Sequence, residues 1–343
     1  MDSKARLAPP DPKVVLCGQS PVSSLIFGPQ ETYKERPVVI SGHENGRIIE
    51  WSGTTQRVVV SWPAHTQSVI WLAWILPDKL LSQGRDGVVR VWTSDGSSWI
   101  CVGEIPCAPI MFCDCAIADC DSHIKLAVPS EQTSRVDVHT LDKQRLLSQT
   151  SVMAPEDSQV VFVLSHSLKP LAPETYGMCM RLRMFIHTSS APRLLIAYES
   201  GKLTLWDTVR GILLHEVKGY EDCIMAMDYW VSPDSGMIMC VTGSANEMIK
   251  SWKIDEDKFV EGTSVSVTNP GIGDIAVRGD GRIFASGGWD NRVRVFSLRK
   301  FSPLVVLMYH TGSVHCVSFA PDNTLATGSK DGYIALWDVY KDK

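Results

Sequence analysis

The sequence predicts an all-β fold, a seven-bladed β-propeller closed by its own N-terminal strand, and three observations predict it. Short strand–turn–strand units recur along the 343 residues with a period near 40–45. Polar residues repeat at matched offsets inside the best of these units. One extra strand precedes the first unit, where a ring of blades needs a closing strand.

The clearest units are SQGRDGVVRVW, which ends at Trp92, and TGSKDGYIALWD, which ends at Asp338. In each, an Asp-Gly turn joins a short strand to a second strand with alternating apolar residues, a strong hairpin signal. Related units end at Trp51, Asp207, Trp252 and Phe296.

Aromatic residues that close the units stand at positions 51, 92, 206, 252, 296 and 337, with spacings of 41, 114, 46, 44 and 41. The gap of 114 must hold one more unit, and a degenerate copy ends at His139. Seven units of this period, each with four short strands, are typical of WD-repeat propeller blades.

Two units are expected to bury a hydrogen-bond relay that runs from a turn carboxylate through an imidazole and a hydroxyl to an indole N–H. The first relay comprises His65, Ser82, Asp86 and Trp92, and the second His310, Thr327, Asp331 and Trp337, at identical separations of 17, 4 and 6 residues. The sixth unit keeps the offsets with Asn269, Ser286, Asp290 and Phe296, so its relay is partial. The other four units lack the turn aspartate and are expected to depend more on packing.

The N-terminal strand Val14–Cys17 is expected to become the outer strand of the last blade, which closes the ring and protects its edges. The chain is predicted to be one domain, residues 1–343, with a flexible tail over residues 1–13 and a long inter-blade loop over residues 148–177. That loop is either a tolerated surface insertion or a docking loop anchored by Phe162.

The composition is that of an ordinary globular protein, with 44% hydrophobic and 21% charged residues. A net charge of −5 argues against general nucleic-acid binding, which needs a basic face. There is no apolar N-terminal stretch typical of a secretory signal, and the longest apolar run, residues 69–76, is too short to span a bilayer. Ten cysteines without a CxxC pair favour a reducing compartment, so we expect a cytoplasmic and nuclear protein.

Motifs for catalysis or cofactor binding are not found: the sequence has no phosphate loop, dinucleotide fingerprint, HExxH or GxSxG. The cluster Cys107, Cys113, Cys115, Cys120 and His123 offers zinc ligands, but its spacings of 6, 2, 5 and 3 fit no zinc knuckle or ribbon. Buried structural thiols are the favoured interpretation. The strand patterns indicate no cluster of inward carboxylates or histidines, so we expect no cofactor, no metal and no enzyme.

Binding is the more promising function. Residues just before the turn aspartate, or its replacement, are expected to ring the narrow face of the propeller: Glu44, Arg85, Glu199, Ala245, Trp289 and Lys330. Trp289, with Arg292 and Arg294 nearby, is either an exposed interface anchor or a ring packed on a neighbouring blade. Tyr220 and Tyr309 could extend the same face.

Two stretches of the chain resemble one particular family and not only WD repeats in general. TNPGIGDIAVRGDGRIFASGGWDNRVRVF and LLSQGRDGVVRVW resemble the guanine nucleotide-binding protein subunit beta-like family of WD-repeat proteins, which has relatives in the fungal ASTRA assembly. The resemblance implies a monomeric adaptor without catalytic activity. It also implies protein partners, the TTT co-chaperone complex and the phosphatidylinositol-3-kinase-related kinases that this system matures, and a role in DNA-damage signalling.

Two other propeller classes fit less well. A G-protein β subunit resembles this chain in its blades but needs N-terminal heptads to bind a γ subunit, and only about a dozen residues precede the first strand here. Cullin-ligase substrate receptors often carry a basic residue two positions after a closing Trp-Asp. Here Trp206-Asp207 is followed by Thr208-Val209, and Trp337-Asp338 by Val339-Tyr340.

Overall fold

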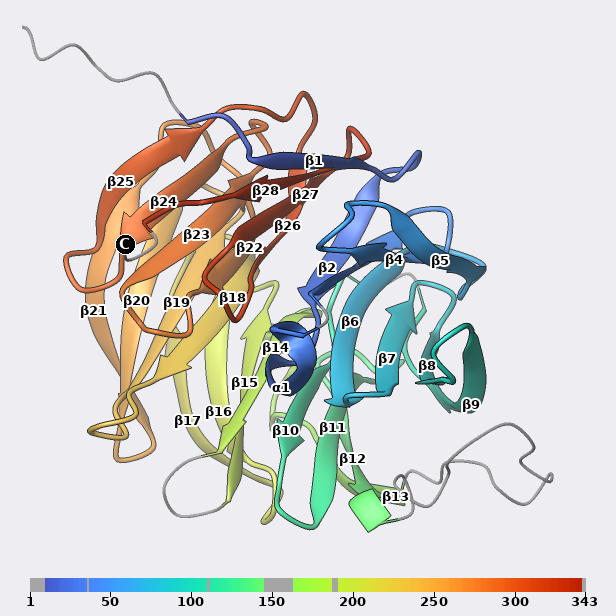
Figure 1. The fold of residues 1–343 in the computed structure, drawn as a ribbon. Helices are drawn as coiled ribbons and strands as arrows, with labels where there is room; N and C mark the ends of the chain where they lie inside the picture. The colour runs from blue at the N-terminus through green and yellow to red at the C-terminus, as the bar shows by residue number, and fades with distance from the viewer. Residues whose placement is uncertain (1–9, 36, 110–111, 145–162, 187–190, 341–343) are drawn as a thin grey trace, which may run out of the picture.

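A computed structural model describes residues 10–35, 37–109, 112–144, 163–186 and 191–340. Its strands form seven four-stranded antiparallel sheets arranged around a central channel, so the predicted seven-bladed propeller is confirmed (Figure 1). Among the described residues, only two short helices accompany them, α1 (Gln30–Tyr33) and the 3-10 turn η1 (Pro173–Thr175). Within the described part of the chain, no helix has the length and apolar character needed to cross a membrane.

Each blade runs from an inner strand at the channel to an outer strand at the rim. Blade 1 is β2 (Val22–Phe27), β3 (Val38–His43), β4 (Arg47–Ser52) and β5 (Val58–Pro63). Blade 2 is β6 (Val69–Leu76), β7 (Lys79–Gly84), β8 (Val88–Ser94) and β9 (Trp99–Pro106). Blade 3 is β10 (Ala116–Asp119), β11 (His123–Pro129), β12 (Val136–Asp142) and β13 (Val163–Leu168). Blade 4 is β14 (Cys179–Ile186), β15 (Pro192–Tyr198), β16 (Lys202–Asp207) and β17 (Ile212–Lys218).

The remaining three blades follow the same order. Blade 5 is β18 (Ile224–Val231), β19 (Ile238–Ser244), β20 (Met248–Asp255) and β21 (Lys258–Ser266). Blade 6 is β22 (Ile272–Val277), β23 (Ile283–Gly288), β24 (Val293–Ser297) and β25 (Ser302–Leu307). Blade 7 is β26 (Val314–Phe319), β27 (Leu325–Ser329), β28 (Tyr333–Trp337) and β1 (Val14–Cys17).

Ring closure by the N-terminal strand is confirmed. Strand β1 lies antiparallel to β28, with Val14 opposite Leu336 and Cys17 opposite Tyr333, and Figure 1 shows the two side by side. The backbone N–H of Lys13 extends this ladder to the carbonyl of Leu336 at 2.8 Å. The first and last segments of the chain therefore share one sheet, and this sheet holds the ring shut.

The hydrophobic core is divided into seven layers, each between two neighbouring blades. Trp92 lies between blades 1 and 2, in a layer that includes Ile40 and Leu72. Trp337 lies between blades 6 and 7, against residues such as Val295. The period-two pattern of the strands explains this, because a middle strand places alternate side chains on the two faces of its blade. Both faces are covered by neighbours, so the middle strands are almost entirely buried.

The expected loop over residues 148–177 is only partly a loop. Within it, Val163–Leu168 forms β13, which pairs with β12 as the outer strand of blade 3, and Pro173–Thr175 forms η1. Of the β13 residues only Leu168 is buried, because an outer strand faces solvent, so the alternation that reveals a strand is weak. Phe162 lies outside the described residues, as do residues 1–9 of the expected tail over residues 1–13.

Candidate functional site

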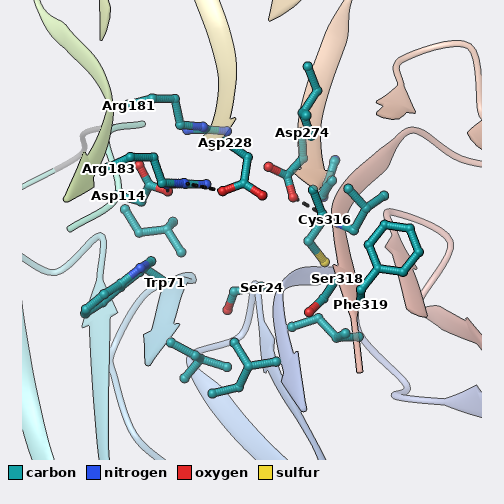
Figure 2. Close-up of a pocket in the computed structure, with 18 of the residues that line it drawn as sticks. Ser24, Trp71, Asp114, Arg181, Arg183, Asp228, Asp274, Cys316, Ser318 and Phe319 are labelled. Atoms are coloured by element: carbon teal, nitrogen blue, oxygen red, sulfur yellow. Dashed lines mark hydrogen bonds and ion pairs between the residues drawn. The ribbon is translucent and has the colours of Figure 1, made fainter. Parts of the chain in front are cut away.

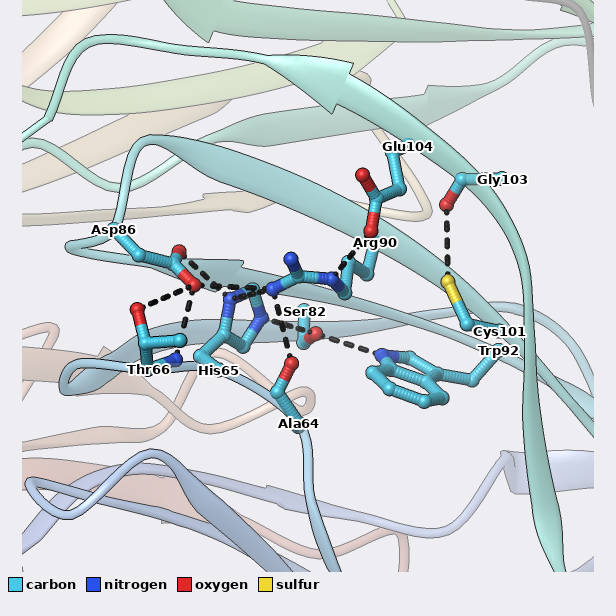
Figure 3. A network of polar contacts seen from close by, with 10 residues as sticks. All are labelled: Ala64, His65, Thr66, Ser82, Asp86, Arg90, Trp92, Cys101, Gly103 and Glu104. Atoms are coloured by element: carbon cyan, nitrogen blue, oxygen red, sulfur yellow. Dashed lines mark hydrogen bonds and ion pairs between the residues drawn. The ribbon is translucent and has the colours of Figure 1, made fainter.

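The relay predicted in blade 2 is present, in the predicted order (Figure 3). The indole N–H of Trp92 donates to Ser82 Oγ at 2.8 Å, and Ser82 Oγ lies 2.7 Å from His65 Nε2. His65 Nδ1 lies 2.9 Å from Asp86 Oδ1. One set of protons satisfies all three links: Ser82 donates to Nε2, and Nδ1–H donates to the carboxylate. The imidazole is therefore neutral in this arrangement.

Burial supports the neutral form. Burial lowers the pKa of His65, against the opposing effect of the Asp86 carboxylate. Burial would raise the pKa of Asp86, but the backbone N–H of Thr66 and the imidazole hold it below its usual value. Both groups are engaged within the blade, so this histidine-aspartate pair is a structural element.

Blade 7 repeats the relay and blade 6 keeps half of it, as predicted. His310 lies 2.8 Å from Thr327 Oγ1 and 3.1 Å from Asp331 Oδ2, and the Trp337 indole donates to Thr327 at 3.0 Å. In blade 6 the Asn269 amide donates to Asp290 at 2.9 Å. There Phe296 has no N–H to donate, and the buried Ser286 hydroxyl has no hydrogen-bond partner among the described residues.

The expectation that the other blades depend more on packing is only partly right. In blade 1 the Trp51 indole donates to Ser41 Oγ at 2.8 Å, and Ser41 lies 2.9 Å from His43 of the same strand. In blade 5 the Trp252 indole donates to Thr242 Oγ1 at 2.8 Å. A hydroxyl ten residues before the closing tryptophan marks both blades, and Ser82 and Trp92 already display that spacing. The signal for these bonds is therefore the ten-residue spacing and not the turn aspartate, which both blades lack.

Tyr220 does not extend the binding face, and that expectation is wrong. Its side chain is 5% exposed, and its hydroxyl lies 2.8 Å from Thr242 Oγ1, where it takes the place that histidine has in blades 2 and 7. A buried phenol needs a hydrogen-bond partner, and Thr242 provides one inside the blade.

The predicted ring of turn residues lies on one face, because six blades hold the turn with an equivalent bond. In each, the backbone N–H of the ring residue donates to a carbonyl in the loop that leads into the inner strand of the same blade. The pairs are Glu44 with Pro21 (3.0 Å), Arg85 with Ser68 (2.9 Å), Glu199 with Met178 (2.9 Å), Ala245 with Cys223 (2.9 Å), Trp289 with Gly271 (3.0 Å) and Lys330 with Ser313 (2.9 Å). We call this surface the turn face.

Most of the six turn residues that make up the turn face have side chains open to solvent. Glu44, Glu199 and Lys330 are exposed, whereas Arg85 is half-buried, with its guanidinium 4.7 Å from the Phe112 ring centre. Trp289 is 46% exposed, so it is not a core residue. One side of its ring covers Gly271, where a Cβ would meet the indole at 2.3 Å and where φ is +94°.

The channel contains a charged cluster that was not among the predicted site residues. Its members include Asp114, Arg183, Asp228 and Asp274. It lines a cavity of about 420 Å³ between the inner strands (Figure 2). Arg183 lies 2.6 Å from Asp114 and 3.5 Å from Asp228, so strands of blades 4 and 5 and the segment before β10 meet at one guanidinium. The expectation of no inward carboxylate cluster is therefore wrong. Each strand contributes only one or two of these groups, and only the closed ring brings them together.

The carboxylates of this cluster also tie blades to each other. Asp228 accepts the backbone N–H of Val277 at 2.7 Å, and Asp274 accepts that of Val317 at 2.9 Å, in each case from the next blade. Burial raises the pKa of Asp274 to about 6, against the opposing effect of two nearby arginines. The cluster therefore joins blades 3 to 7 around the channel.

The cysteines of the possible zinc cluster lie mainly in the core. Cys107, Cys113 and Cys115 are buried, and burial raises the pKa of the Cys107 thiol to about 12. No group of three or more histidine, cysteine, aspartate or glutamate residues in the described ranges is placed to hold a metal ion. The buried thiols act as small apolar side chains here.

Comparisons with known proteins agree with this architecture. The family model "WD domain, G-beta repeat" matches residues 262–297 and 301–338. The chain is 34% identical to guanine nucleotide-binding protein subunit beta-like protein 1 of Mus musculus, over 97% of each chain. It is 25% identical to ASTRA-associated protein 1 of Verticillium alfalfae, over 98% of this chain and 95% of the relative. For ASTRA-associated protein 1 of Schizosaccharomyces pombe the identity is 24%, over 96% and 99%.

Proposed function

Because the chain belongs to the family of guanine nucleotide-binding protein subunit beta-like protein 1, a family of WD-repeat scaffolds, we propose that it is an adaptor of the TTT co-chaperone system. In this role it assists the maturation and stability of phosphatidylinositol-3-kinase-related kinases and thereby supports DNA-damage signalling. It acts without catalysis, in the cytoplasm and the nucleus.

The observation that carries the proposal is the turn face. Six blades present an equivalent turn residue on one side of a rigid ring, and four of these side chains are exposed. A rigid surface that displays a large aromatic residue together with charges of both signs is suited to bind proteins. Likeness to fungal proteins named ASTRA-associated over nearly their whole length points to the kind of assembly.

A non-catalytic role agrees with how the titratable groups are engaged. The relay histidines donate to aspartates of their own blades, and the channel carboxylates accept backbone N–H groups of neighbouring blades. The hydrogen bonds of these histidines and carboxylates hold the ring together, so a structural role explains why these groups are buried there.

Affinity purification of the tagged full-length chain, followed by mass spectrometry, tests the proposal. We expect TTT subunits and the kinases to be recovered, and degradation of the adaptor to lower the amount of newly synthesised kinase in a pulse-chase experiment. Recovery of G-protein γ subunits or cullin-ligase components without TTT subunits would overturn it.

A further inference from the structure

The turn face carries an apolar and basic patch at the seam between blades 6 and 7. It comprises Trp289, Arg292, Met308, Tyr309, Lys330 and Tyr333, which we call the seam patch. Trp289, Arg292 and Lys330 belong to turns between middle strands. Met308 and Tyr309 follow β25, and Tyr333 begins β28.

Hydrogen bonds between the two blades place Trp289 beside Lys330. The Ser313 hydroxyl donates to the Trp289 carbonyl at 3.1 Å, and the Ser313 carbonyl accepts the Lys330 N–H at 2.9 Å. The Asn291 amide also donates to the Thr311 carbonyl at 3.2 Å. The turns of the two blades are therefore fixed on either side of one loop.

The outer part of the patch is continuous with this loop. Arg292 directly precedes Val293 and Met308 directly follows Leu307, and Val293 and Leu307 are paired across the two strands. The ring centres of Tyr309 and Tyr333 lie 6.5 Å apart, edge to face. The patch thus extends from Trp289, through Met308 and Tyr309, to the start of β28.

The apolar members are large and open to solvent: Met308 is 57% exposed, Trp289 46%, Tyr333 39% and Tyr309 38%. A contiguous surface of two tyrosines, a tryptophan and a methionine has the composition of a protein-binding site. Methionine adapts its shape to a partner, and the aromatic rings are placed rigidly by the blades.

The charge of the seam patch is positive. Among the described residues, neither the Arg292 nor the Lys330 side chain forms an ion pair. The neighbouring carboxylates are already engaged, since Asp290 binds Arg294 at 2.6 Å and Asp331 binds His310 at 3.1 Å. Glu44, the exposed turn residue of the neighbouring blade 1, marks the edge of the patch.

Other parts of the turn face have the opposite charge. Blades 4 and 5 present four exposed carboxylates there, Glu199, Glu221, Asp222 and Glu247, against one exposed cation, Lys218, which lies 3.5 Å from Glu221. An anionic partner would be repelled from these blades and attracted to the seam between blades 6 and 7. The charge distribution therefore favours an acidic partner and directs it to the seam between blades 6 and 7.

We propose that the seam patch binds an acidic segment of a partner protein, one in which aspartate or glutamate residues alternate with apolar side chains. The carboxylates pair with Arg292 and Lys330, and the apolar side chains pack on Trp289, Met308 and Tyr309. This inference rests on the proposed adaptor function for the identity of the partner, but its chemistry stands on the patch alone.

Site-specific cross-linking tests the proposal. A photoreactive benzoylphenylalanine replaces Met308 in the full-length chain, and the cross-linked partner segment is identified by mass spectrometry. The same capture is measured with the charge-reversal variant R292E/K330E. The matched control is R299E/K300E, because Arg299 and Lys300 are exposed at the other end of the same blade, in the turn after β24.

We expect an acidic segment with apolar residues to be captured, a loss of about tenfold or more with R292E/K330E, and unchanged capture with R299E/K300E. Equal melting temperatures of the two variants show that both fold. A neutral or basic captured segment, or an equal effect of the two variants, would overturn the seam proposal. If TTT subunits are purified with the wild-type chain but no acidic segment is captured at Met308, the seam proposal fails and the adaptor function stands. If an acidic segment is captured at Met308 and lost with R292E/K330E, but no TTT subunit is purified with the wild-type chain, the seam proposal stands and the adaptor function fails.

Discussion

Ser82→Ala and Ser286→Ala remove the same atom from equivalent positions of two blades, and we predict very different costs. Both side chains are buried, at 0% and 1% exposure. The Ser82 hydroxyl binds the Trp92 indole at 2.8 Å and the His65 ring at 2.7 Å. The Ser286 hydroxyl has no partner among the described residues.

The expected change in the free energy of unfolding depends on which polar groups each substitution leaves without a hydrogen-bond partner. Ser82→Ala leaves a buried indole N–H and a buried imidazole nitrogen without partners, at about 1–3 kcal/mol each, so we expect a total of about 2–6 kcal/mol. Ser286→Ala removes an unsatisfied hydroxyl and is expected to change the free energy of unfolding by about 0.5 kcal/mol or less, or to stabilise the protein.

Urea unfolding followed by tryptophan fluorescence measures the difference. We expect the midpoint of Ser82→Ala to fall while that of Ser286→Ala stays within error of the wild type, with equal slopes. Equal destabilisation by the two substitutions would show that packing around the serine, and not the relay, stabilises these blades.

Three further predictions concern single residues. Tyr220→Phe removes the bond to Thr242 and is expected to cost about 1–2 kcal/mol in urea unfolding; no cost would show that this bond does not stabilise blade 5. Asp274 has its pKa raised from 3.8 to about 6, so its charge opposes folding increasingly as pH rises from 3.8 to 6. Asp274→Asn keeps an acceptor for the Val317 N–H and should stabilise the protein by about 1–3 kcal/mol above pH 6 and hardly at all at pH 4; a stabilisation independent of pH would refute this. Trp289→Ala should weaken capture of partners while costing about 1 kcal/mol of stability, and a large drop in melting temperature would show that the indole is a packing residue.

The fold and the relay could be predicted because they depend on short-range spacing. Ser82, Asp86 and Trp92 belong to one hairpin, and His65 to the loop that leads into the inner strand of the same blade, so their offsets in sequence fix their distances in space. The closing strand Val14–Cys17 was also predictable, since a ring of blades cannot leave an apolar strand and an open edge unpaired.

The channel cluster could not be predicted in the same way. Arg183, Asp228 and Asp274 come from three blades, and each reads as an ordinary polar residue in its own strand. Only the closure of the ring brings these inner strands together at one axis. Tyr220 was misplaced for a related reason, because the histidine that it replaces comes at a different offset from its hydroxyl partner.

The central claim is that this propeller is an adaptor that binds the TTT system through its turn face. The most direct test is mass photometry of the purified full-length chain mixed with purified TTT complex. We predict a stable complex of the combined mass, retained by R299E/K300E and weakened by R292E/K330E. If the wild-type chain and the TTT complex remain separate at micromolar concentrations, the propeller is not an adaptor of the TTT system.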